Sequence, residues 1–124
     1  MAIDVIEHLK KNRAILLIKK MEKLAKKIVI IRTTNGYMKQ ELVNENPFQQ
    51  HLSGFIAEDL EKMNYRLIGM DGPKFLRVNK KGICLKKNLP TSILANLLDP
   101  ILRSFPKMSF NILAYKILNE RIDN

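Results

Sequence analysis

Side chains that could catalyse a reaction or hold a metal ion are few in this sequence of 124 residues, and they lie far apart. Glu58, Asp59 and Glu61 are close enough to suggest Mg²⁺, but on a helix such neighbouring carboxylates point in different directions. We therefore interpret them as solvated surface acids. The only histidines, His8 and His51, are distant in the sequence, so for His51 a surface or phosphate-contacting role is favoured over a metal.

The remaining chemistry is equally sparse. The sequence has no Gly-rich phosphate loop and no cluster of His or Cys residues with the spacing of metal ligands. Its single cysteine, Cys84, excludes an internal disulfide and is best interpreted as a small buried apolar residue. The sequence therefore predicts a protein that is not an enzyme and that has no metal site and no cofactor.

Positive charge is the strongest chemical signal. Twenty-two Lys and Arg against twelve Asp and Glu give a net charge of +10, which makes a polyanion the expected partner. Nine bases between His8 and Arg32 are opposed by Glu22 alone, and a second basic run without an acid extends from Pro73 to Leu98. Nucleic acid is the first expectation. An anionic membrane surface is a distant alternative, because the Lys-rich first segment has no Trp or Phe anchors.

The elements that carry these bases are predicted from apolar spacing. Residues 1–32 have a helical pattern, with an apolar stripe on one side, Lys19, Lys23, Lys26 and Lys27 on the other, and a bend near Asn12. Residues 29–31 are β-branched and could instead leave the helix as an extended piece. The stripe consists of Ala14, Leu17, Met21, Leu24, Ile28 and Ile31.

A second helix is predicted to begin at Asn46-Pro47, a capping residue followed by a proline that tolerates the first helical position. It should run to about Asn64 with one buried face. That face consists of Phe48, Leu52, Phe55, Ile56, Leu60 and Met63.

Residues 65–82 follow as a predicted β-hairpin, turning at Asp71-Gly72-Pro73. Thr91 or Ser92 should then cap a helix that is kinked or broken at Asp99-Pro100, and residues 109–122 should form a last helix. No stretch approaches the roughly 20 apolar residues of a membrane span, and residues 1–9 carry acids where a signal peptide carries bases. We therefore expect a cytoplasmic protein without a membrane partner.

This order of elements resembles the winged helix-turn-helix superfamily over residues 14 to 82. The residues that carry the resemblance are GYMKQEL, then NPFQQHLSGFIAEDLEKMNYRLIG, then KFLRVNKKG. They are similar to a recognition helix ending in Leu60-Glu61-Lys62, a strand over 65–70 that opens the wing, and a returning strand that closes on Lys81-Gly82. The implied fold is mainly α with a small β-hairpin wing.

The resemblance implies a double-stranded DNA-binding protein, with a transcription regulator as the leading interpretation. The helix over 47–64 would enter the major groove, with Gln49, Gln50 and Ser53 facing base edges. The acids at the end of that helix would repel phosphate, so only its first two turns could approach DNA. The implied phosphate contacts are Lys39, His51, Lys74, Arg77, Lys80 and Lys81.

We expect one domain over residues 1–124, with regions at 1–32, 33–87 and 88–124. The last region is apolar on more than one side, so a homodimer interface is predicted there. Its expected residues are Leu97, Leu98, Ile101, Leu102, Leu113 and Ile117. The alternative is a non-catalytic winged-helix accessory subunit of a replication or transcription assembly, which binds protein partners and binds DNA without sequence specificity.

Overall fold

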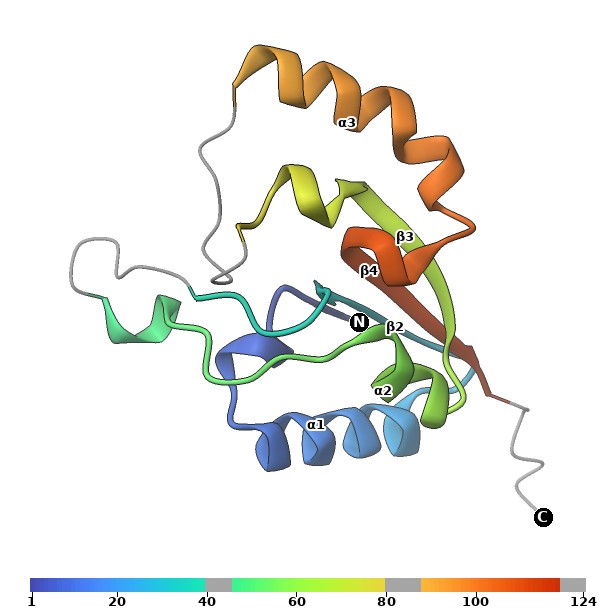
Figure 1. Cartoon of the computed structure of the whole chain (residues 1–124). Coiled ribbons are helices and arrows are strands. Elements are labelled where there is room, and N and C mark those ends of the chain that lie inside the picture. Colours follow the sequence, from blue (N-terminus) through green and yellow to red (C-terminus); the bar gives the residue numbers. More distant parts are fainter. Residues whose placement is uncertain (40–45, 80–87, 119–124) are drawn as a thin grey trace.

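The computed structural model describes residues 1–39, 46–79 and 88–118. It is an α+β fold built on one four-stranded mixed sheet in the order β1-β2-β4-β3 (Figure 1). The strands are β1 (Ala2–Ile3), β2 (Ile28–Thr34), β3 (Arg66–Pro73) and β4 (Ser109–Ile117). Strand β1 is parallel to β2, whereas β4 pairs antiparallel with both β2 and β3. The predicted fold, mainly helical with a hairpin wing, is therefore wrong.

The first predicted helix is replaced by several elements. After β1 come a 3₁₀ helix, η1 (Ile6–His8), and then α1 (Lys11–Leu24), which ends before β2. The run of β-branched residues forms β2, as the extended alternative predicted, with Val29, Ile31 and Thr33 buried on one face. Leu24, expected in the apolar stripe, is 81% exposed, and the buried residue of the second turn is Ile18.

The predicted last helix is the strand β4. Its apolar residues also fit a period of two, and Ile112 and Ala114 point into the core from the same face. β4 lies between β2 and β3, so both of its edges are hydrogen-bonded. This long-range pairing outweighs the helical spacing that the sequence also carries.

The predicted hairpin wing is also wrong. Residues 66–73 form a single strand whose partner is β4, and the chain continues into a 3₁₀ helix, η3 (Lys74–Leu76). Asp71 and Gly72 do adopt positive φ, at 64° and 76°, but they form an irregularity within β3 and not a hairpin turn. A hairpin turn and an irregularity within a strand can both place an Asp-Gly pair at positive φ. The Asp-Gly pair in the sequence therefore did not distinguish the two.

The predicted recognition helix over 47–64 is broken into three parts. Asn46 does cap its start, accepting a hydrogen bond from the Phe48 N–H, but only a 3₁₀ helix, η2 (Pro47–Gln49), follows. An extended segment then leads to the short helix α2 (Ala57–Lys62). The backbone N–H groups of Leu52 and Ser53 donate to the Glu7 carbonyl, so this segment bonds to η1 in place of a helical ladder.

The core lies between one face of the sheet and the helices α1 and α2. Phe55 and Leu60 are buried there as predicted, but Phe48, Leu52 and Ile56 are exposed. The main contributors are Ile6, Ala14, Ile18, Val29, Ile31, Phe55, Leu60, Ile112 and Ala114.

Helix α3 (Leu89–Leu102) packs on β3, on the side of the molecule away from α1 (Figure 1). Asn88, not Thr91 or Ser92, is its N-cap, and the helix continues through Pro100 without a break. A side chain at Gly69 would lie 2.1 Å from the Leu102 carbonyl oxygen, so the glycine permits a very close approach. A last 3₁₀ helix, η4 (Pro106–Met108), leads into β4.

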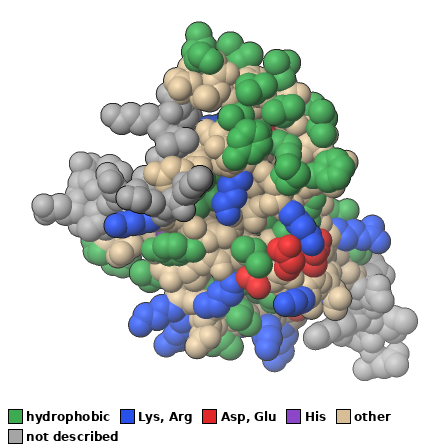
Figure 2. All heavy atoms as spheres, viewed as in Figure 1, with side chains coloured by type: hydrophobic (Ala, Val, Ile, Leu, Met, Phe, Trp, Pro, Cys, Tyr) green, Lys and Arg blue, Asp and Glu red, His purple; other side chains and the backbone are tan. Residues whose placement is uncertain are grey.

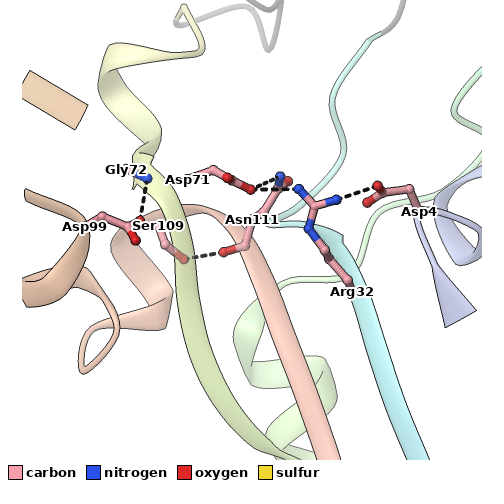
Figure 3. A network of polar contacts seen from close by, with 7 residues as sticks. All are labelled: Asp4, Arg32, Asp71, Gly72, Asp99, Ser109 and Asn111. Carbon is pink, nitrogen blue, oxygen red and sulfur yellow. Dashed lines mark hydrogen bonds and ion pairs between the residues drawn. The ribbon is translucent and has the colours of Figure 1, made fainter. Parts of the chain in front are cut away.

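A polar network ties the strands together at one end of the sheet (Figure 3). Arg32 contacts Asp4 at 2.6 Å and Asp71 at 2.8 Å, and the Asn111 amide donates to the same Asp71 oxygen at 2.6 Å. Burial alone would raise the pKa of the Asp71 carboxyl, but the hydrogen bonds from Arg32 and Asn111 outweigh it and hold that pKa below its ordinary value.

Candidate nucleic-acid interface

The outer face of α1 and the turn after it form a basic surface. Its members are exposed, and none makes an ion pair or a side-chain hydrogen bond within the described part of the chain. We call this set the α1 basic face: Lys10, Arg13, Lys19, Lys20, Lys23, Lys26 and Lys27. The inner side of the helix is anchored by the buried Ala14 and Ile18, which fixes this face toward solvent.

Two further bases, Lys11 and Arg32, form ion pairs with acidic residues of the protein. Lys11 contacts Asp59 at 2.6 Å and lies over the Phe55 ring, 3.8 Å from its centroid. On β2, Arg32 is held by Asp4 and Asp71. They are therefore excluded from the α1 basic face.

Apart from Glu7, the acidic side chains of the described residues lie close to a basic side chain. Lys107 bridges Glu58 and Glu61 at 3.2 and 3.7 Å, and the interaction with Glu58 raises the pKa of the Lys107 ammonium. Glu22, the one acid of α1, accepts from Lys116 and Tyr65. Because the described acids are engaged in this way, the positive charge of the α1 basic face is not cancelled by neighbouring carboxylates.

The three predicted base-contacting residues do not share a helix. Gln49 ends η2, and Gln50 follows it in extended conformation. Ser53 is buried, and its hydroxyl donates to the Ile6 carbonyl at 3.3 Å. Residues 47–64 therefore do not form the recognition helix on which the prediction of base contacts depended.

The predicted phosphate contacts are dispersed. Lys74 donates to the Asn35 carbonyl, Arg77 is half-buried 5.8 Å from the centroid of the Phe110 ring, and Lys39 is exposed. His51 is hydrogen-bonded to the Met38 carbonyl. Lys80 and Lys81 lie outside the described residues.

A second surface is apolar and lies on α3. Leu89, Ile93, Leu97 and Ile101 recur every four residues and are exposed, Leu97 at 69%. Figure 2 shows hydrophobic side chains gathered over this part of the molecule. The adjoining groove has a volume of about 280 Å³ and is lined by Pro73, Phe75, Leu98, Ile101, Leu102, Phe105 and Met108.

The residues predicted for a dimer interface divide between two elements. Leu97 and Ile101 belong to the exposed α3 face, Leu98 lines the groove, and Leu102 is buried against β3. Leu113 and Ile117 lie on β4 and not on a last helix. Leu97, Leu98 and Ile101 therefore lie on the exposed face of α3 or in its adjoining groove, whereas Leu113 and Ile117 belong to a different element.

One cluster was missed by sequence reasoning. The rings of His8 and His51 are 4.8 Å apart, centroid to centroid, although the two residues are distant in sequence. Burial lowers the pKa of His51, with the hydrogen bond to Met38 acting in the opposite direction. No local spacing could have revealed this pair, because the extended segment after η2 brings His51 back to η1.

Comparison with known proteins found no match among protein-family models, curated proteins or solved structures. Within residues 1–39, 46–79 and 88–118, no helix has both the length and the apolar character needed to cross a membrane.

Proposed function

We propose that this protein binds duplex DNA through its phosphate backbone, using the α1 basic face, without catalysing a reaction on it. The observation that carries the proposal is the set of exposed, unpaired bases on the outer side of α1 and the turn after it, opposite the buried Ala14 and Ile18. Lys and Arg that neutralise phosphates release condensed counterions, and this release is the main source of non-specific affinity for DNA.

The dimensions of α1 suit this role. A helix of 14 residues is roughly 21 Å long, and phosphates along one DNA strand lie a few ångströms apart, so several bases can reach phosphates together. Long, flexible Lys side chains predominate in the set, and they contact phosphate as mobile point charges. This favours binding that depends little on sequence.

The biological class that fits best is a non-catalytic DNA-binding accessory protein of the cytoplasm. Sequence-specific regulation would require side chains that reach base edges from a rigid element. Gln49 is the last residue of a single 3₁₀ turn, and Gln50 follows that turn. The hydroxyl of Ser53 is already hydrogen-bonded to the Ile6 carbonyl. A regulator that reads base edges is therefore the less favoured interpretation.

We also propose that two copies associate through α3. An uncharged stripe on α3 repeats every four residues and consists of Leu89, Ile93, Leu97 and Ile101. Ridges with this spacing on two helices can pack into each other's grooves. A two-fold axis would place the same ridge on both sides of the interface. The second copy would cover apolar surface that is otherwise exposed to water.

Paired charge-removing variants test the DNA site. The variant Lys20→Gln/Lys23→Gln removes two charges from the α1 basic face. Arg103→Gln/Lys107→Gln removes two charges from the end of α3 and η4, where both bases already have acidic partners. We expect the first variant to bind a random-sequence duplex more than about tenfold more weakly at low salt, and the control to bind within about threefold of the parent.

The same assay can contradict the proposal. Equal losses in the two variants would indicate a response to net charge alone, and unchanged binding in Lys20→Gln/Lys23→Gln would exclude the α1 basic face. Incubation of the duplex with divalent metal tests the absence of catalysis, and we expect the DNA to stay intact.

A further inference from the structure

Glu7, His8 and His51 bring one carboxylate and two imidazoles to a single place. Each residue offers a ligand atom, and the three atoms lie within 4.8 Å of one another. Glu7 and His8 come from η1, while His51 comes from the extended segment after η2. The backbone hydrogen bonds from Leu52 and Ser53 to the Glu7 carbonyl hold these two segments together.

The hydrogen bonds of the histidines determine which ring nitrogens are free. Nδ1 of His51 lies 2.9 Å from the Met38 carbonyl oxygen, and Nδ1 of His8 lies 3.2 Å from the Gln50 carbonyl oxygen. A carbonyl oxygen only accepts, so both Nδ1 atoms must carry the proton. In the neutral rings the lone pairs are then on Nε2. An imidazole oriented by a carbonyl in this way is the usual arrangement of a metal-binding histidine.

Glu7 supplies a second, independent observation. Its side chain is 1% exposed, and one carboxylate oxygen, Oε2, accepts from the Thr33 hydroxyl at 3.1 Å. Among the described residues, no Lys or Arg nitrogen lies within 4.0 Å of this carboxylate. A carboxylate buried without a cation is costly, and a bound metal ion removes that cost.

We propose that Glu7, His8 and His51 form a binding site for a divalent first-row transition metal ion, with Zn²⁺ as its simplest occupant. Two imidazole nitrogens and one carboxylate oxygen are a ligand set that suits Zn²⁺. Carboxylates and waters alone would favour Mg²⁺ or Ca²⁺, whereas imidazoles favour the transition metals.

The spacing fits a site that closes around the ion. Ligand atoms on a tetrahedral Zn²⁺ are about 3.4 Å apart, given bonds of 2.0–2.2 Å. The three ligand atoms lie within 4.8 Å of one another, so each pair has to approach by about 1.4 Å at most. His8 is only partly buried, so an ion can enter from solvent past this ligand. Three protein ligands leave a fourth position for water.

Calorimetric titration with ZnCl₂ tests the site on the full-length chain without a histidine tag. We expect one equivalent to bind. His8→Ala, His51→Ala and Glu7→Gln should each weaken Zn²⁺ by more than about 100-fold, because each removes a direct ligand and even second-shell changes cost 10–100-fold. Cys84→Ser, which removes the single thiol, and Glu58→Gln, which removes an exposed carboxylate, should bind as the parent does.

The visible absorption of bound Co²⁺ gives a second readout that does not depend on stability. A tetrahedral spectrum in the parent, lost in His51→Ala while circular dichroism remains unchanged, supports the assignment. If Glu7→Gln does not fold, Thr33→Val tests the same carboxylate through its hydrogen-bond donor and should weaken Zn²⁺ about tenfold. The absence of stoichiometric binding to the parent, or full binding to His51→Ala, would overturn the proposal.

Discussion

Arg32 on β2 and Asp71 on β3 are joined by an ion pair of 2.8 Å that spans the intervening strand β4. The Asn111 amide on β4 donates to the same Asp71 oxygen, so one carboxylate links three strands (Figure 3). Asp71 can occupy this position because its backbone adopts a φ of 64°, which Asp tolerates better than most residues.

This relationship predicts a stability that depends on pH. Because the folded-state pKa of Asp71 lies below its unfolded value, its contribution is fully present above the unfolded value of about 4 and is lost as the pH falls through the folded value. Asp71→Asn keeps the positive φ, and we expect it to lower the free energy of unfolding by about 1 kcal/mol at pH 7, after allowance for partial exposure.

Urea unfolding of parent and variant between pH 7 and pH 2.5 checks this expectation. The difference should shrink below about pH 4, where the parent also loses the charge. Asp4→Asn is the matched control, since it removes the more exposed partner of Arg32 and should cost less. A constant Asp71→Asn difference across the pH range would contradict the assignment.

Truncation to Ala is predicted to cost much more stability at Leu60 than at the nearby Ile56. Leu60 on α2 is fully buried, and Leu60→Ala should cost about 2–5 kcal/mol. Ile56, which helical spacing would also place in the core, is 44% exposed, so Ile56→Ala should cost about 1 kcal/mol or less. Denaturant midpoints give both values, and a larger loss at Ile56 would mean that α2 is placed incorrectly.

Gly69 is predicted to be required for the packing of α3. A methyl group there meets the Leu102 backbone oxygen, which cannot rotate away, so Gly69→Ala should destabilise by about 1–3 kcal/mol. Asn96→Ala on the exposed side of α3 should have little effect or stabilise slightly. Thermal unfolding compares the two, and parent-like melting of Gly69→Ala would show that α3 does not lie against β3.

Self-association through α3 is predicted to depend on its apolar stripe. Light scattering at micromolar concentration should give a mass twice that of the 14.4 kDa chain. Leu97→Asp places a charge in the stripe and should yield monomers, whereas Asn96→Asp adds the same charge at the neighbouring exposed position and should leave the dimer intact. A monomeric parent would contradict the proposed interface.

Some local features could be predicted from the sequence because their causes are local. The Asn46 cap, the outward bases of α1 and the extended run after it follow from capping chemistry, helical period and β-branching. The predicted apolar stripe was wrong at Leu24, because the helix ends there and this side chain is exposed, whereas Met21 in the same turn packs against the core.

The sheet could not be predicted in the same way. Strand β4 carries apolar residues that fit periods of two and of 3.6, and its pairing with β2 and β3 decides between them. Likewise, the Asp71-Gly72 pair correctly predicted positive φ, but the predicted hairpin turn does not form there. The meeting of His8 and His51 depends on backbone bonds between distant segments, which no local pattern contains.

The salt dependence of DNA binding tests the central proposal most directly. Each phosphate contact contributes about 0.9 to the slope of log K against log salt concentration. For Lys20→Gln/Lys23→Gln on a random duplex we predict a slope about two units smaller than that of the parent, with Arg103→Gln/Lys107→Gln retaining the parental slope. A parental slope in the α1 variant, or a loss shared by the control, would contradict DNA binding through the α1 basic face.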